Sequence, residues 1–152
     1  FLKKKVTKFI QIGSCAEYGK AEAPQNESLQ CLPNSPYASA KLEATRFSLM
    51  LYISKKFPIT ILRFFQVYGP RQDQNRALPQ IIKNCLNNKK FPVSEGNQIR
   101  DFCYVDDVVN AIFLALKSRN SDGEIINIGY GKPTKIKDLI KKISRIIKFT
   151  FL

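Results

Sequence analysis

The chain has 152 residues, of which 44% are hydrophobic, and its 25 basic and 12 acidic side chains give a formal net charge of +13. It contains no histidine, and its four cysteines form no Cys-x-x-Cys pair, which excludes a histidine-based triad and the usual zinc sites. No apolar run approaches the roughly 20 residues that cross a bilayer, and the first residues lack the apolar core of a secretory signal. We therefore expect no bound metal, no membrane partner and a cytoplasmic location.

The positive charge is spread along the sequence. A protein with this net charge attracts polyanions, which makes a basic nucleic-acid binder a competing hypothesis. Most lysines are scattered or lie at the expected ends of helices, as in Lys55-Lys56 and Lys141-Lys142, and no aromatic side chains alternate with them. We interpret the charge as a solvated surface and expect no nucleic-acid partner.

The first half of the chain predicts a strand, a loop, a long helix and a second strand. Residues 8–14 form a short apolar run that ends in glycine and serine, as a buried strand does. A loop with prolines leads to a helix predicted from Pro36 to about Lys56. The apolar face of this helix is expected at Leu42, Thr45, Leu49 and Ile53. Residues 59–65 then predict a strand buried on both faces, in which Arg63 needs a partner.

The second half continues the alternation of helices and strands. A helix is predicted over residues 78–87, and another begins where Asp106 or Asp107 can cap it. The periodic apolar positions of that helix are Val109, Ile112, Phe113 and Leu116. A strand over residues 124–128 precedes a last helix, for which Thr134 is the expected N-cap. The buried face of the last helix is expected at Ile136, Leu139, Ile140, Ile143 and Ile147. This order predicts an α/β fold with a Rossmann-like parallel sheet and a smaller substrate-binding part.

The segment Gly129-Tyr130-Gly131 has a second interpretation. It follows an apolar strand and precedes a helix, as a phosphate-binding loop does. The position of the expected third glycine is Thr134, however, and a helix N-cap explains this residue better. We therefore favour an ordinary strand-to-helix connection.

Ser14, Tyr37 and Lys41 are the candidate catalytic residues. A free tyrosine phenol has a pKa of about 10, and a nearby positive charge favours its ionised form. If a helix begins at Pro36, residues 37 and 41 lie on one face, and the helix N-terminus adds partial positive charge there. A serine hydroxyl can orient the reacting oxygen, so the three groups together predict proton transfer.

A second tyrosine and lysine pair has the same spacing, Tyr52 with Lys56. Apolar residues precede Tyr52 late in the same predicted helix. For this pair we expect an ordinary structural role, with a half-buried ring and a solvated lysine.

Five segments in chain order resemble one known family. These segments are residues 9–19 (FIQIGSCAEYG), 34–41 (NSPYASAK), 61–72 (ILRFFQVYGPRQ), 96–108 (GNQIRDFCYVDDV) and 125–132 (IINIGYGK). In this order the chain resembles the extended short-chain dehydrogenase/reductase family, whose members epimerise, dehydrate or reduce nucleotide sugars. The resemblance implies a Rossmann-like fold and a nicotinamide cofactor, NAD or NADP.

The resemblance also implies that the chain is a fragment. No segment reads strand, Gly-x-x-Gly-x-x-Gly and helix, which is how this family binds the pyrophosphate of the cofactor. We expect residues 1–69 to be the catalytic part of the Rossmann-like domain and residues 70–104 the substrate-binding part. Residues 105–152 would add a returning helix, strand and helix, incomplete at the C-terminus.

Carried over residue by residue, the resemblance implies specific roles. Tyr37 would be the general acid and base, Lys41 would bind the nicotinamide ribose together with Tyr37, and Ser14 would donate to the sugar oxygen. Gln66 stands where the family has a substrate-binding asparagine. The residues implied to bind substrate are Gln66, Phe91, Val93 and Arg100, with Arg71 and Arg76 as further candidates for phosphate.

The segment before the Tyr-Gly pair bears on the reaction. Family members that eliminate water carry acidic residues two and three places before this tyrosine, but here Ala16 and Cys15 occupy these places. We therefore expect a nucleotide-sugar epimerase or a 4-keto-sugar reductase that acts on a nucleotide-diphosphate sugar, and a homodimer, which the family often forms. The alternatives are a catalytically incomplete fragment or binding module, and a nucleotide-sugar dehydratase.

Overall fold

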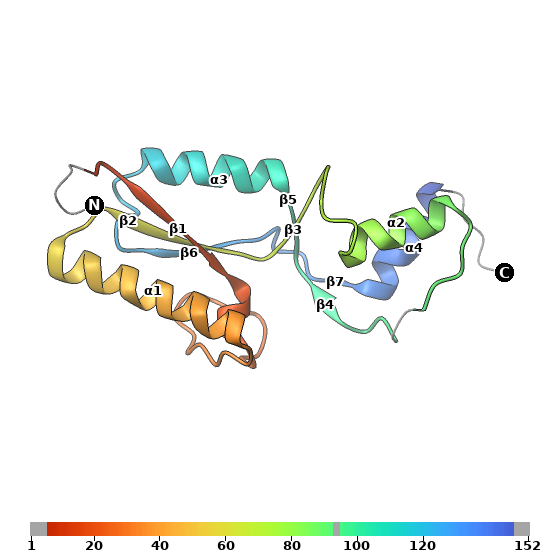
Figure 1. Cartoon of the computed structure of the whole chain (residues 1–152), viewed down its shortest axis with the longest axis horizontal. Helices are drawn as coiled ribbons and strands as arrows, with labels where there is room; N and C mark the ends of the chain where they lie inside the picture. Colours follow the sequence, from red (N-terminus) through yellow and green to blue (C-terminus); the bar gives the residue numbers. More distant parts are fainter. Residues whose placement is uncertain (1–5, 93–94, 148–152) are drawn as a thin grey trace. The chain divides into compact units, whose positions relative to one another are not determined.

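The computed structural model describes residues 6–92 and 95–147 and divides the chain into two compact units (Figure 1). One unit contains the residues up to Phe65 together with Asp106–Gly129, and the other contains Gln66–Val105 and the chain from Tyr130 onward. Residues 70–104 thus lie in the second unit, which also includes the last helix. The assignment of substrate binding to residues 70–104 stays a prediction.

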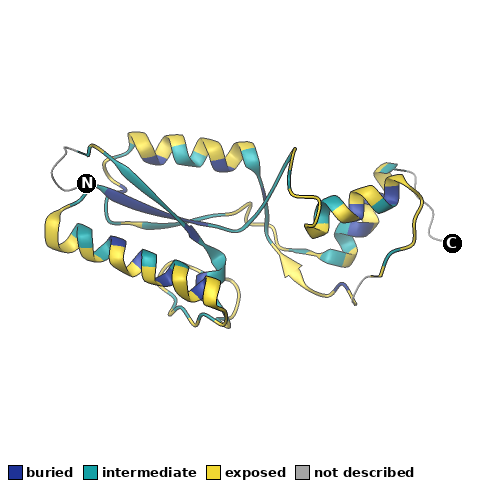
Figure 2. Cartoon of the chain, viewed as in Figure 1, coloured by how far each residue is buried: buried dark blue, intermediate teal, exposed yellow. Residues whose placement is uncertain are grey.

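The first unit is built on a three-stranded parallel sheet. Its strands are β1 (Phe9–Ser14), β2 (Ile59–Phe64) and β6 (Ile125–Ile128), in the order β1-β2-β6. Helices α1 (Pro36–Lys55) and α3 (Val105–Lys117) lie on opposite faces of this sheet (Figure 1). The central strand β2 is buried along nearly its whole length (Figure 2), as its continuous apolar sequence predicts. The predicted α/β fold with a parallel sheet is confirmed.

The strand register places the ends of the three strands together. Ser14 pairs with Phe64, and Phe64 pairs in turn with Ile128. In an open parallel sheet, ligands bind beyond the carboxyl ends of the strands. Ser14 therefore lies at the edge of the sheet where such a site is expected.

Helix α1 begins and ends where the sequence indicates. The Ser35 side chain caps its N-terminus, Pro36 occupies its first turn, and Lys56 ends it in a left-handed conformation. Its buried residues are Ala38, Leu42, Thr45 and Ser48. The expectation for Ile53 was wrong, because its side chain is exposed near the C-terminal end of the helix.

Helix α3 differs from its prediction in two respects. It begins at Val105, so Asp106 and Asp107 lie in its first turn, where their charges favour the helix dipole, and do not cap it. Val108 and Ala115 are the buried residues of this helix. Three residues of the predicted apolar face are exposed: Val109, Phe113 and Leu116. The apolar residues of α3 are distributed around most of its circumference, so periodicity alone does not identify the buried face of the helix.

The second unit contains two short strand pairs. Strand β3 (Gln66–Tyr68) is parallel to β5 (Phe102–Tyr104), and β4 (Ile99–Arg100) is antiparallel to β7 (Thr134–Lys135). Thr134 is therefore a strand residue that pairs with Arg100, and the predicted N-cap was wrong. The cross-strand pairing with β4 outweighs the local preference of threonine for a cap.

Two helices form the core of the second unit. Helix α2 (Ala77–Leu86) packs against α4 (Ile136–Ile147). The buried residues of this core are Ile81, Cys85, Ile140 and Ile143, with Ile136, Leu139 and Ile147 partly buried against them. The predicted apolar face of the last helix is confirmed. Within the described residues, none of the helices has the length and apolarity that a bilayer-spanning segment requires.

Candidate active site

Ser14 ends β1 and begins the short 3₁₀ helix η1 (Cys15–Tyr18). The Ser14 hydroxyl accepts a hydrogen bond from the Ala16 N–H at 3.2 Å, and the Ser14 N–H donates to Glu17 Oε1 at 2.8 Å. This capping box orients the serine at the edge of the sheet. The hydroxyl hydrogen can donate to a substrate oxygen.

The Tyr18-Gly19 pair closes the turn after Ser14. Tyr18 is fully buried and its hydroxyl donates to Asn127 Oδ1 at 2.8 Å. Gly19 has a φ of 58°, and a Cβ atom there would collide with the backbone carbonyl of Leu32, with which it forms a β-bridge. The glycine of this motif is therefore required by the close approach of the loop over residues 20–35.

Tyr37 and Lys41 lie in the first two turns of α1. The Lys41 ammonium donates to the Ile12 carbonyl at 2.9 Å and lies 5.9 Å from the centroid of the Tyr37 ring. Tyr37 itself is 58% exposed. The hydrogen bond from Lys41 joins the tyrosine helix to the strand that ends in Ser14, so the structure brings this lysine to the serine strand and leaves the phenol open to a ligand.

The second tyrosine and lysine pair lies at the other end of α1 and has a structural environment. The Lys56 ammonium lies 5.3 Å from the centroid of the Tyr52 ring and is exposed. The ring of Tyr52 packs directly against the backbone of Gly123, so that a Cβ atom there would collide with it. The expected half-buried ring and solvated lysine are confirmed, and the pair provides a matched control for Tyr37 and Lys41.

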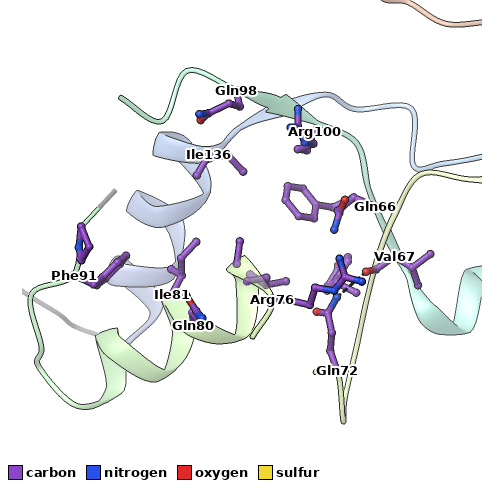
Figure 3. A pocket seen from close by; sticks show the side chains of 15 residues that line it. Gln66, Val67, Gln72, Arg76, Gln80, Ile81, Phe91, Gln98, Arg100 and Ile136 are labelled. Carbon is purple, nitrogen blue, oxygen red and sulfur yellow. Dashed lines mark hydrogen bonds between the residues drawn. The ribbon is translucent and has the colours of Figure 1, made fainter. Parts of the chain in front are cut away.

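The second unit contains a cavity of about 350 Å³ lined by substrate-binding candidates (Figure 3). Gln66, Phe91 and Arg100 line it together with Arg76. Among the fifteen described residues that line it, two are arginines and none is acidic, which favours an anionic ligand. Val93 lies outside the described residues, and Arg71 lines a separate cavity of about 420 Å³.

Sequence reasoning missed several polar residues of the first cavity. Tyr68, Gln72, Gln80 and Gln98 line it, and none was a candidate. Gln98 could have been found, because it precedes Arg100 by two residues and alternate residues of a strand share a face. The other three come to the cavity from β3 (Tyr68), from α2 (Gln80) and from the loop between them (Gln72), which the sequence does not place together.

In the loop over residues 129–131, Tyr130 and Gly131 are held by hydrogen bonds to a side chain of the same unit. The Asp101 carboxylate accepts hydrogen bonds from the backbone N–H groups of Tyr130 and Gly131, at 3.0 and 2.9 Å. A phosphate-binding loop requires such N–H groups to point at its ligand. Because Asp101 already occupies them, the phosphate-loop interpretation is disfavoured, as expected. The sequence does not identify Asp101 as the partner of these N–H groups, because Asp101 precedes Tyr130 by 29 residues and Gly131 by 30.

The partly buried thiol of Cys31 lies near Arg63 and Glu17. Burial raises the pKa of the Cys31 thiol above its usual value, and the Arg63 guanidinium partly offsets this. A thiol of this kind is protonated at neutral pH and is therefore a poor nucleophile.

Comparison with known proteins matches this chain to one family and to individual enzymes of that family. A family model described as "NAD dependent epimerase/dehydratase family" matches residues 1–129. The human dTDP-D-glucose 4,6-dehydratase is 35% identical over 96% of this chain, which corresponds to 42% of that protein. A UDP-glucuronate 4-epimerase of Thermodesulfobacterium geofontis is 32% identical over 93% of this chain and 44% of that protein. The chain thus spans less than half the length of these relatives.

Solved structures agree in fold. The UDP-glucuronic acid 4-epimerase of Bacillus cereus, in complex with UDP-glucuronic acid and NAD, has a TM-score of 0.89 and 36% identity over 97% of this chain and 48% of that chain. The RMD protein of Pseudomonas aeruginosa, complexed with NADPH, has a TM-score of 0.87 and 26% identity over 95% of this chain and 52% of that chain. These matches confirm the Rossmann-like fold that the five motifs predict. The chain belongs to the NAD-dependent epimerase/dehydratase family of extended short-chain dehydrogenases/reductases.

Proposed function

We propose that the protein containing this chain is a nucleotide-sugar epimerase or a 4-keto-sugar reductase that uses NAD or NADP. The hydrogen bond from the Lys41 ammonium to the Ile12 carbonyl is the observation that carries the proposal. It joins the Tyr-x-x-x-Lys helix to the serine strand at the carboxyl edge of a parallel sheet. The relatives named above are epimerases and dehydratases of nucleotide sugars, which supports the same substrate class.

Each catalytic candidate then has a defined role. Tyr37 removes the proton from the sugar hydroxyl during oxidation and returns it during reduction, so charge does not accumulate on the oxygen. Ser14 donates a hydrogen bond to the same oxygen and orients it. Lys41 supplies positive charge beside the phenol. A nicotinamide cofactor, when bound, exchanges hydride with the sugar carbon.

The residues present fit a cofactor ribose at this edge. Tyr37 is exposed at the start of α1, and Lys41 is anchored one helical turn later, so both polar groups can meet a ligand beyond the carboxyl end of β1. The groups that bind the cofactor pyrophosphate are proposed to lie in a part of the protein outside this sequence. The homodimer and the cytoplasmic location stay predictions.

The cavity of the second unit is proposed to bind the nucleotide diphosphate. Arg100 and Arg76 supply guanidinium groups, which make paired hydrogen bonds to phosphate oxygens, and Phe91 supplies an aromatic face for the base. Gln66 lines the same cavity and retains the amide of the family's asparagine, one methylene farther from the backbone. Val93 remains a proposed member of this site.

Arg100→Ala is expected to weaken nucleotide-sugar binding. Losing hydrogen bonds to a charged phosphate costs a factor of about 10 to 100 in Kd. Titration calorimetry with UDP-glucuronic acid measures the change. Arg119→Ala is the control, because it removes the same charge from an exposed position of the first unit. Equal Kd values for the two variants would contradict the assignment of Arg100.

Dehydration is the less favoured reaction. The places that carry acidic residues in dehydratases are Cys15 and Ala16, so the two carboxyl groups that dehydratases have there are replaced by a thiol and a methyl group. Glu17 is the nearest carboxylate, but it is fully buried and bound to three donors. This arrangement favours epimerisation or reduction.

The test uses the protein expressed from its complete reading frame. It is incubated with NAD or NADP and UDP-glucose, UDP-glucuronic acid or dTDP-glucose, and the products are identified by NMR. A C4 epimer that keeps its C6 oxygen is the expected result for an epimerase. A parallel incubation contains NADH or NADPH and a nucleotide-linked 4-keto sugar, and oxidation of the reduced cofactor is the expected result for a reductase. A 4-keto-6-deoxy product would show a dehydratase, and tight nucleotide-sugar binding without turnover would favour the binding module.

A further inference from the structure

The carboxylate of Glu17 connects three elements of the first unit. It is fully buried at the end of η1. Its Oε1 accepts the N–H of Ser14 at 2.8 Å, and its Oε2 accepts the Thr45 hydroxyl and the Arg63 Nε–H, both at 2.9 Å. These donors come from the end of β1, from α1 and from β2. One side chain thus binds the proposed catalytic serine and the proposed catalytic helix together.

The position of Thr45 makes this connection relevant to catalysis. Thr45 follows Lys41 by four residues, as Lys41 follows Tyr37, so the three residues lie along one face of α1. The hydrogen bond between Glu17 and Thr45 therefore fixes that face against the turn after Ser14. The Lys41 contact with Ile12 fixes the same face against β1.

The residues around Glu17 accommodate its buried ion pair with Arg63. A Cβ atom at Gly13 would lie 2.7 Å from Glu17 Oε1, so a larger residue there would displace this carboxylate. Arg63 is 2% exposed, and its guanidinium lies 4.7 Å from the centroid of the Tyr18 ring. Burial acts to lower the pKa of Arg63, but Tyr18 and the Glu17 carboxylate together raise it above its usual value. The arginine is therefore charged, as its partner requires.

Stability alone does not explain such a pair. Removing two charges from water costs several kcal/mol each, and apolar residues of the same volume often stabilise a protein as well or better. Within the described residues Arg63 Nη1 is buried without a hydrogen-bond partner, which adds to the cost. Directional hydrogen bonds, in contrast, define the distance and the angle between the groups they join, whereas apolar contacts define no such angle.

We propose that Glu17 is a positioning residue, whose carboxylate, paired with Arg63, sets the geometry between Ser14 and the Tyr37–Lys41 pair. This inference rests on the proposed function, in which those three residues act on the sugar oxygen. Glu17 itself touches no ligand, because it is fully buried. It acts through the backbone of Ser14 and through the helix that carries Tyr37.

The first test compares Glu17→Gln with Glu43→Gln in the complete protein. Glu43 lies on α1 and is exposed, so its variant is expected to keep full activity. Glu17→Gln replaces one acceptor by a donor and loosens the connection. We expect kcat to fall about 10- to 100-fold, as for a displacement of about 1 Å, while the Kd for UDP-glucuronic acid stays unchanged. Unchanged kcat, or a loss confined to Kd, would overturn the inference.

The second test separates positioning from folding. Glu17→Met with Arg63→Met replaces the buried pair by apolar side chains, and this double variant is expected to fold. Its kcat is expected to be as low as that of Glu17→Gln. Thr45→Val removes only the hydrogen bond between Glu17 and α1, and it should also lower kcat. A double methionine variant that folds and has full kcat would show that the pair is merely structural.

A third variant distinguishes failure of this inference from failure of the proposed function. Glu17→Gln is combined with Tyr37→Phe, and residual turnover is measured. Because Glu17 acts through Tyr37 and Ser14, we expect it to lower the residual rate of the Tyr37→Phe protein much less than the parent rate. If Tyr37→Phe alone retains full turnover, the proposed function is wrong. If Tyr37→Phe is inactive but Glu17→Gln is fully active, only the positioning role is wrong.

Discussion

Replacing Tyr37 by phenylalanine is expected to lower kcat by about 100- to 10,000-fold, the range that a general acid and base contributes. The variant loses only the phenol oxygen, and Tyr37 is 58% exposed, so the fold should be unaffected. Lys41 keeps its hydrogen bond to the Ile12 carbonyl. Nucleotide-sugar binding, measured by calorimetry in the protein from the complete reading frame, should therefore be retained.

Tyr52→Phe is the matched control for this prediction. Tyr52 belongs to the same helix and has a lysine at the same spacing, with its ring centroid 5.3 Å from the ammonium, against 5.9 Å for Tyr37. Its ring packs on Gly123, and the control should turn over normally. If Tyr37→Phe and Tyr52→Phe proteins show equal rates, proximity of lysine and tyrosine has no catalytic meaning here.

Arg63→Met is expected to destabilise the first unit by about 3–5 kcal/mol, because it leaves the Glu17 carboxylate buried without its cation. The methionine fills much of the volume of the arginine, so the loss reflects the unpaired charge more than a cavity. Urea titration monitored by circular dichroism measures the free energy of unfolding.

Arg46→Met is the control for the buried pair. Arg46 forms an exposed ion pair with Glu43 one turn earlier on α1, and such pairs contribute less than about 1 kcal/mol. A loss of similar size in both variants would mean that burial of Arg63 does not determine its effect. Recovery of stability when Glu17→Met is added to Arg63→Met would support the stated cause.

Local sequence signals identified the elements that carry the candidate site. Two such signals are the glycine and serine that end the run over residues 8–14 and the Ser35-Pro36 start of α1. Each acts within a few residues, so it predicts the same local structure in any tertiary context. The Tyr37–Lys41 spacing depends only on the helical repeat. The five ordered motifs also indicated the family correctly, because each combines such local requirements.

Predictions that depended on packing were less accurate. Val109, Phe113 and Leu116 of α3 are exposed although they are apolar and periodic. Ile53 is exposed near the end of α1, and Thr134 forms a strand pair with Arg100. In each case a neighbouring element decides whether the side chain is covered or the backbone is paired, and the sequence near the residue does not contain that information.

By itself, the sequence determined the α/β class, the helix and strand that present Ser14, Tyr37 and Lys41, and the need of Arg63 for a partner. Only the tertiary structure decided that this partner is Glu17, that Asp101 binds the loop at Tyr130 and Gly131, and that Gln80 joins Arg100 at one cavity. The physical reason is distance along the chain. Hydrogen-bonded caps and turns form between close residues, whereas buried charges are paired by whatever the folded chain brings next to them.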